Sequence, residues 1–69
     1  MTEAEARQTI AQITAVFVAE PYDIVRDIEL KCEDDENFLA AKEVLGEDWH
    51  YEMNWTVIAT AGGDSKAEV

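Results

Sequence analysis

The most regular alternation of apolar and polar positions lies in residues 34–46 and has the period of a helix. Its apolar stripe consists of Phe38, Ala41, Val44 and Leu45. Glu36, Glu43 and Glu47 nearly superpose on the opposite side when each residue turns the helix by about 100°. Asp34 is a favourable N-cap, and Gly46 is a typical residue to follow the end of a helix. The pattern therefore predicts a helix between Asp34 and Gly46.

Residues 1–19 carry two overlapping patterns. Thr2 and Glu5 match a capping box, and the apolar residues that follow them have helical spacing: Ala6, Ile10, Ile13 and Phe17. From Ile13 to Val18, however, β-branched and aromatic residues predominate, which favours a strand. We expect a short helix to about Gln12 and then a strand to about Ala19, with the two interpretations competing over residues 10–18.

Two further segments alternate with a period of two. After Pro21, one face of residues 24–32 carries Ile24, Ile28, Leu30 and Cys32, and the other face carries Asp27, Glu29 and Lys31. Residues 51–60 alternate in the same way. We expect a strand in each segment, with the first paired as a hairpin to the strand before it. A helix that begins at Pro21 is the rival for the first segment, because Val25, Ile28 and Cys32 also fit helical spacing.

Together these elements predict a single small α+β domain in residues 1–61, with an N-terminal helix followed by the order β-β-α-β. A mainly antiparallel three-stranded sheet would pack on one helix, because a lone hairpin is only marginally stable in water. Residues 62–69 include Gly62 and Gly63, and we expect them to form a flexible tail.

The charge of the chain points to a class of partner. The 69 residues include 16 Asp and Glu against 5 Lys and Arg, which gives a formal net charge of −11. Residues 20–52 hold most of these acids. Direct binding of nucleic acid through a basic surface is therefore excluded. Because solubility alone requires only about 2–8 net charges, we expect a basic protein partner.

No apolar run in the chain approaches the roughly 18 residues of a membrane helix, and no segment has the pattern of a signal peptide. We expect a cytoplasmic protein that makes no contact with membranes.

Residues suited to catalysis or metal binding are scarce. Ser65 is the only serine and lies in the expected tail, while Cys32 and His50 are the only residues of their kinds. A zinc site needs about four ligands. A calcium-binding loop that starts at Asp34 would have leucines where the EF-hand needs Gly and Glu. We expect no enzyme activity, no bound metal and no cofactor.

The predicted partner-binding surface combines acidic side chains with one aromatic residue. Asp27 and Glu29 would lie on the polar face of a strand, about 6.6–6.8 Å apart. Trp49 is a candidate anchor because we expect it in an acidic loop, although core packing is the plainer interpretation of the group Trp49, Tyr51 and Trp55. The complete set is Asp27, Glu29, Glu33, Asp34, Asp35, Glu36, Glu43, Glu47, Asp48 and Trp49.

In its small size, strong acidity and scarcity of catalytic residues, the chain resembles the phage-encoded anti-CRISPR and anti-restriction inhibitors, several of which are DNA mimics. Residues 13–46 are also similar to the strand–strand–helix pattern of DpnD/PcfM-like mobile-element proteins, through residues 27–36 and Ala40-Ala41-Lys42. The resemblance implies a non-enzymatic inhibitor that occupies the basic nucleic-acid channel of a host defence complex. Such a complex could be a CRISPR effector, which would then fail to bind its target DNA.

Two other functions stay open. An immunity or antitoxin-like protein would bind one basic nuclease or toxin through the same electrostatics. A small structural protein would instead form a homodimer through an exposed strand edge, with an acidity that serves only solubility. The first predicts a single small, tight partner, and the second predicts a dimer that is indifferent to salt.

Overall fold

The structure is a computed structural model, and it describes residues 1–61. Over this range the chain is helical and contains no strand, so the expected α+β fold with a three-stranded sheet is wrong. The four helices are α1 (Glu3–Val18), α2 (Val25–Lys31), α3 (Glu36–Leu45) and α4 (Asp48–Ala61). The expected tail, residues 62–69, lies outside the described residues.

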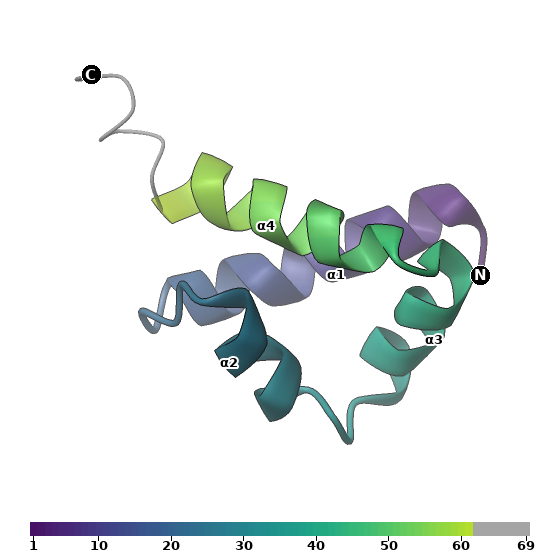
Figure 1. Ribbon diagram of the computed structural model, residues 1–69, viewed down its shortest axis with the longest axis horizontal. Helices are drawn as coiled ribbons and strands as arrows, with labels where there is room; N and C mark the ends of the chain where they lie inside the picture. Colours follow the sequence, from purple (N-terminus) through teal and green to yellow (C-terminus); the bar gives the residue numbers. More distant parts are fainter. Residues whose placement is uncertain (62–69) are drawn as a thin grey trace.

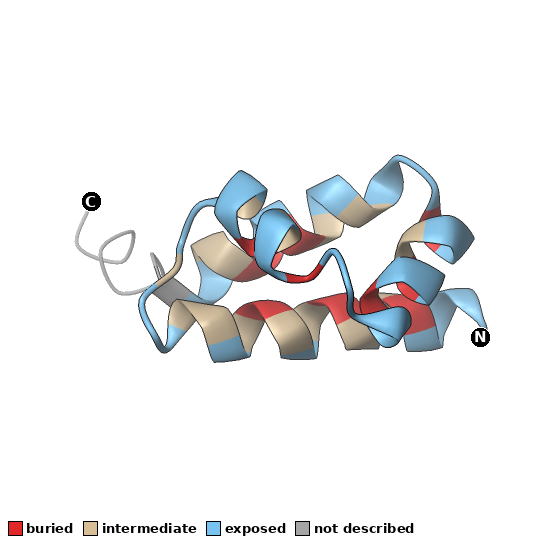
Figure 2. Ribbon diagram, turned by 90° about the horizontal axis from the view of Figure 1, so that it is seen from below, coloured by how far each residue is buried: buried red, intermediate tan, exposed pale blue. Residues whose placement is uncertain are grey.

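Helices α1 and α4 lie side by side and run in the same direction, while α2 and α3 lie together on one side of them (Figure 1). Figure 2 views the molecule from that side, with α2 and α3 nearest the reader. Helix α1 packs mainly against α3 and α4, and α2 packs against α4. The segment from α2 to α3 thus brings the chain back to the start of α1, where α4 begins.

All four helices contribute to one hydrophobic core. Ile10, Ile28, Phe38 and Met53 come from α1, α2, α3 and α4 in turn, and each is completely buried. The remaining buried apolar residues are Ala6, Cys32, Ala41 and Leu45. The buried positions face the centre of the helical assembly (Figure 2). Every helix therefore has one inward face, and burial of that face is the main source of stability for helices this short.

Helix α1 continues through the segment that we expected to be a strand, so the prediction of a strand over residues 13–19 is wrong. Ala6, Ile10 and Thr14 form a buried stripe at helical spacing. The Thr14 hydroxyl donates a 2.6 Å hydrogen bond to the carbonyl of Ile10, which satisfies its polar group inside the core. Burial against α3 and α4 thus outweighs the β-propensity of residues 13–18, because that propensity reflects packing context more than the backbone itself.

The capping box at the start of α1 is confirmed. The backbone N–H of Glu5 donates to the Thr2 hydroxyl at 3.1 Å, and the backbone N–H of Thr2 donates to the Glu5 carboxylate at 2.8 Å. The hydrogen bond from the Thr2 backbone also lowers the pKa of the Glu5 carboxyl.

The predicted strand over residues 24–32 is wrong, and the rival helix is confirmed as α2, although it begins at Val25 and not at Pro21. Ile28 and Cys32, four residues apart, are buried, and Val25 packs against the core. Ile24 and Leu30, which the strand would have buried, are 57% and 54% exposed. The period-two pattern fails because it groups the exposed Ile24 and Leu30 with the buried residues, whereas a helical repeat places Val25 beside Ile28 and Cys32.

The predicted strand over residues 51–60 is also wrong, because these residues belong to α4. Met53 and Thr56 are buried, and Trp49 and Val57 pack against the core beside them, at the spacing of one helix face. The Thr56 hydroxyl donates to the carbonyl of Glu52 at 2.9 Å. Alternation in this segment thus results from a helix with large apolar residues on both its inner and its outer face.

The predicted helix in residues 34–46 is confirmed as α3, with a shift of one residue at its start. Asp35 is the N-cap in place of Asp34, and its carboxylate accepts hydrogen bonds from the backbone N–H groups of Asn37 and Phe38 at 2.9 and 3.0 Å. Gly46 follows the helix with a φ of 59°, a conformation that other residues adopt at a cost in strain.

Candidate acidic interface

Few acidic side chains are neutralised within residues 1–61. Arg7 contacts the carboxylates of Glu3 and Glu52 at 2.8 and 2.9 Å, and these hydrogen bonds raise the pKa of its guanidinium. Lys42 contacts the Glu29 carboxylate at 3.0 Å. The other acids of the described part pair with no described Lys or Arg. Most of the negative charge of residues 1–61 therefore lacks a Lys or Arg counterion among the described residues.

The unpaired acids of the candidate surface form a nearly continuous series along the chain. They lie on α2, in the α2–α3 connection, on α3, in the α3–α4 turn and at the first residue of α4. All are exposed: Asp27, Glu33, Asp34, Asp35, Glu36, Glu43, Glu47 and Asp48. Helices α2 and α3, which together with their connection carry most of these acids, lie on the side of the molecule that Figure 2 presents. The carboxylates on this side therefore belong to short helices and their connections. The inward faces of these helices are packed in the core.

The structure separates Asp27 from Glu29, which the strand interpretation had placed on one face. Two successive helical steps of about 100° put them on different sides of α2. Asp27 is exposed, whereas Glu29 is half-buried and holds Lys42 of α3. Glu29 thus connects two helices and is less free than the other acids to meet a partner.

Glu36 and Glu43 lie on α3, and a rise of 1.5 Å per residue separates them by about 10.5 Å along its axis. Glu47 follows Gly46 and so stands in the turn beyond the helix. The three residues that were expected on one helix face are therefore divided between α3 and the next turn.

Trp49 is half-buried at the start of α4 and packs against the core. Its ring meets Phe38 edge to face at 5.7 Å between centroids. The Lys42 ammonium lies 4.7 Å from the centre of the same ring. Trp49 therefore fastens α4 to α3, and only part of its surface can reach a partner.

Sequence reasoning favoured core packing for the aromatic group and selected Trp49 as its exposed member, so Tyr51 and Trp55 were left out of the predicted binding surface. They are 69% and 66% exposed, which makes them the most exposed large hydrophobic residues in the described part of the chain. Their spacing of four residues would have revealed a shared outward face if the segment had been interpreted as a helix.

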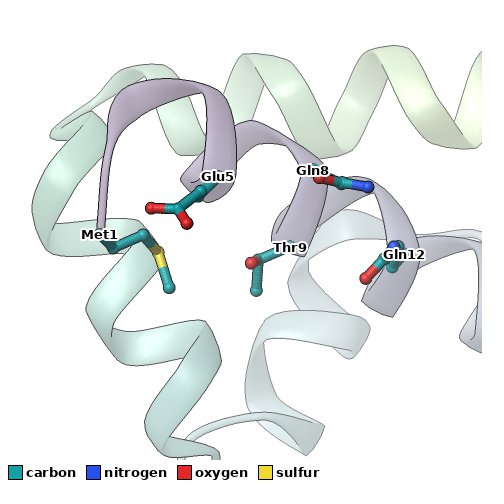
Figure 3. A pocket seen from close by; sticks show the side chains of 5 residues that line it. All are labelled: Met1, Glu5, Gln8, Thr9 and Gln12. Atoms are coloured by element: carbon teal, nitrogen blue, oxygen red, sulfur yellow. The ribbon is translucent and has the colours of Figure 1, made fainter.

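A shallow hollow of about 480 Å³ lies beside the first half of α1. Its lining comes from α1 and the residues before it: Met1, Glu5, Gln8, Thr9 and Gln12 (Figure 3). Glu5 is its only charged side chain and is already engaged with Thr2 in the capping box. The hollow therefore contains amide and hydroxyl groups, but it does not pair a nucleophile with a base that could activate it.

The two residues considered for nucleophilic or metal chemistry occupy different environments. Cys32 is buried, and its burial raises the pKa of the thiol. His50 is exposed on α4. Over residues 1–61, His, Cys, Asp and Glu side chains form no group of three that could hold a metal ion. Ser65 lies outside the described residues.

None of the helices described by the structure combines the length and the apolar character needed to cross a membrane.

Comparisons of the chain with protein-family models, with curated proteins and with solved structures found no match.

Proposed function

We propose that this protein binds the basic nucleic-acid-binding surface of a host defence complex and blocks its access to DNA without catalysing a reaction. The observation that carries the proposal is the series of exposed, unpaired carboxylates between Asp27 and Asp48. A basic DNA-binding groove is the surface that such a series would complement.

The physical basis is competition between two arrays of negative charge. Duplex DNA carries about one negative charge per 1.7 Å of its axis, and the Lys and Arg residues that neutralise it need no particular base sequence. Carboxylates on packed helices can face the same cations. Their main effects are to accelerate association and to select basic partners, with a smaller effect on affinity itself.

The size of the uncompensated charge supports this proposal over solubility alone. A net charge of −11 works against compactness, and a chain of fewer than about 70–80 residues has only about 3–5 kcal/mol of stability from its core. A charge that costs stability would be maintained if a partner uses it. The resemblance to small acidic anti-CRISPR and anti-restriction inhibitors adds a candidate partner, a CRISPR effector.

The proposal can be tested by capturing partners from a bacterial host lysate on the immobilised protein at low salt. Bound proteins are then eluted in parallel with moderate salt and with duplex DNA, and are identified by mass spectrometry. We expect a nucleic-acid-binding protein that both treatments release.

A captured partner that resists both salt and DNA would contradict the proposal. Recovery of one small basic toxin or nuclease would favour the immunity or antitoxin-like function instead. If the immobilised protein captured only its own copies, the acidity would be assigned to solubility.

A further inference from the structure

The outward face of α4 carries two large aromatic side chains that are mostly exposed to water. Tyr51 and Trp55 are 69% and 66% exposed and lie one helical turn apart. Met53, which is completely buried, marks the inward face of the same helix. At about 100° per residue, Tyr51 and Trp55 each lie about 160° around the axis from Met53. The two rings therefore point away from the core and share one surface.

Other aromatic rings of this protein already have a cation from the chain itself. The Lys31 ammonium lies 5.2 Å from the centre of the Tyr22 ring, and the Lys42 ammonium lies 4.7 Å from that of Trp49. In the described part of the chain, no Lys or Arg lies over Tyr51 or Trp55. The faces of these two rings are thus available to a cation from outside.

The charge around the two rings also favours a cation. Helix α4 contains Asp48 and Glu52 but no Lys or Arg. Asp48 precedes Tyr51 by three residues and Trp55 by seven, so all three share one face of the helix. Arg7 neutralises Glu52, whereas no described Lys or Arg pairs with Asp48. The rings therefore lie in a negative field with a carboxylate at one end.

We propose that Tyr51, Trp55 and Asp48 form a docking surface for arginine side chains of a basic partner protein. A planar guanidinium stacks on aromatic faces and can also hydrogen-bond to a carboxylate, which a compact ammonium does less well. This inference rests on the proposed function, because it takes from it the expectation of a basic partner. It adds an aromatic contact that DNA mimicry by charge alone does not require.

A second copy of this chain is a poor occupant of the same surface. The net charge of −11 opposes the approach of two copies, and their acidic α4 faces would meet. Arg7 and Lys42 are held in ion pairs with acids of their own chain. Charge complementarity therefore favours a different, basic protein.

The test uses nona-arginine and nona-lysine peptides as probes, because they carry equal charge and differ in their ability to stack. Calorimetry measures the affinity of each peptide for the wild type and for the double variant Tyr51→Ser/Trp55→Ser. The matched control is Val16→Ser/Leu39→Ser, which removes two exposed apolar side chains, 59% and 43% exposed, from α1 and α3. Circular dichroism verifies that all three proteins are folded.

We expect the wild type to prefer nona-arginine, and the double variant to lose about tenfold in affinity for that peptide. Its affinity for nona-lysine should change little, and the control should behave as the wild type. Equal affinity of the wild type and the double variant for nona-arginine would overturn the inference, as would no detectable binding of that peptide.

A charge-reversal variant distinguishes failure of this inference from failure of the proposed function. The variant Glu36→Lys/Glu43→Lys/Glu47→Lys should lose affinity for both peptides, because it alters charge and leaves the rings in place. If it does so while the aromatic variant binds normally, charge-based binding survives and the arginine surface is rejected. A concentration-dependent dimer that Tyr51→Ser/Trp55→Ser abolishes would assign the surface to a second copy and overturn the inference.

Discussion

Reversing three exposed acids, Glu36→Lys/Glu43→Lys/Glu47→Lys, should strongly weaken partner binding and leave the fold intact. None of the three side chains forms a hydrogen bond or an ion pair with another described residue. The substitutions therefore remove no hydrogen bond or ion pair within the described residues. Lysine in the first turn of α3, at position 36, opposes the helix dipole by about 0.3–1 kcal/mol, whereas lysine at position 43 is favourable near the other end.

The loss of binding can be estimated from the charges. An exposed ion pair contributes about 0.2–1 kcal/mol, and a reversed charge replaces it with repulsion of similar size. Three reversals together cost about 1–6 kcal/mol, which corresponds to a loss of affinity from several-fold to about 10⁴-fold. The loss should shrink as salt rises, because surface charges are screened within about 8 Å at physiological ionic strength.

The assay is surface plasmon resonance against the captured partner at two salt concentrations, with thermal melts followed by circular dichroism. The matched control, Glu20→Lys/Asp64→Lys/Glu68→Lys, changes the net charge equally and leaves the acids of residues 27–48 unaltered. Unchanged affinity of the first variant would refute the reasoning. An equal loss in both variants would show that total charge, and not its position, governs binding.

Three further predictions concern the fold. Met53→Ala removes a completely buried side chain and should cost about 2–5 kcal/mol, which is comparable to the whole stability of so small a domain; we expect extensive loss of helical circular dichroism at 25 °C, and a native spectrum would contradict the assigned core. Thr2→Ala breaks the capping box and should cost about 1 kcal/mol, lowering the Tm by about 4–8 °C; an unchanged Tm would show that the cap does not hold α1. Burial raises the pKa of the Cys32 thiol. The protonated thiol therefore contributes fully to stability below the pKa that it has in the unfolded chain, and this contribution is lost as pH rises from that pKa to the higher pKa of the folded protein. At pH 8 a disulfide reagent should therefore modify the native protein far more slowly than the urea-unfolded chain, and equal rates would place Cys32 at the surface.

Sequence patterns predicted the elements whose ends are encoded by local chemistry. The Thr2–Glu5 capping box and the Gly46 terminus both depend on hydrogen bonds and backbone angles within one turn of helix. The apolar stripe of α3 was also predicted from the sequence, since Phe38, Ala41 and Leu45 are buried on one face. Val44, which the pattern placed in the same stripe, is exposed. These features need no information about the rest of the fold.

The other elements could not be derived from local pattern, because two periods fitted the same residues. Ile28 and Cys32 belong both to a period of two and to a helix face, and only contact with the other helices decides between them. In α4, Tyr51 and Trp55 occupy the outer face with large apolar side chains, which hides the helical repeat of the inner face. The same feature concealed them as binding residues.

The sequence predicted which acidic residues would be exposed, Glu29 excepted, but it did not predict how they are arranged on the surface. Exposure of the acids from Glu33 to Glu36 follows from their charge, since carboxylates are rarely buried without partners. The pairing of Glu29 with Lys42 depends on how α2 meets α3, and that arrangement is not encoded within either segment.

The most direct test of the central claim is a competition measurement with the captured partner and fluorescent duplex DNA. The apparent Kd of the partner for DNA is measured by anisotropy as the concentration of this protein rises. If both ligands occupy one basic surface, the apparent Kd increases in proportion to the concentration of the protein and does not level off. An apparent Kd that reaches a plateau, or that does not change, would contradict a shared surface and with it the proposed function.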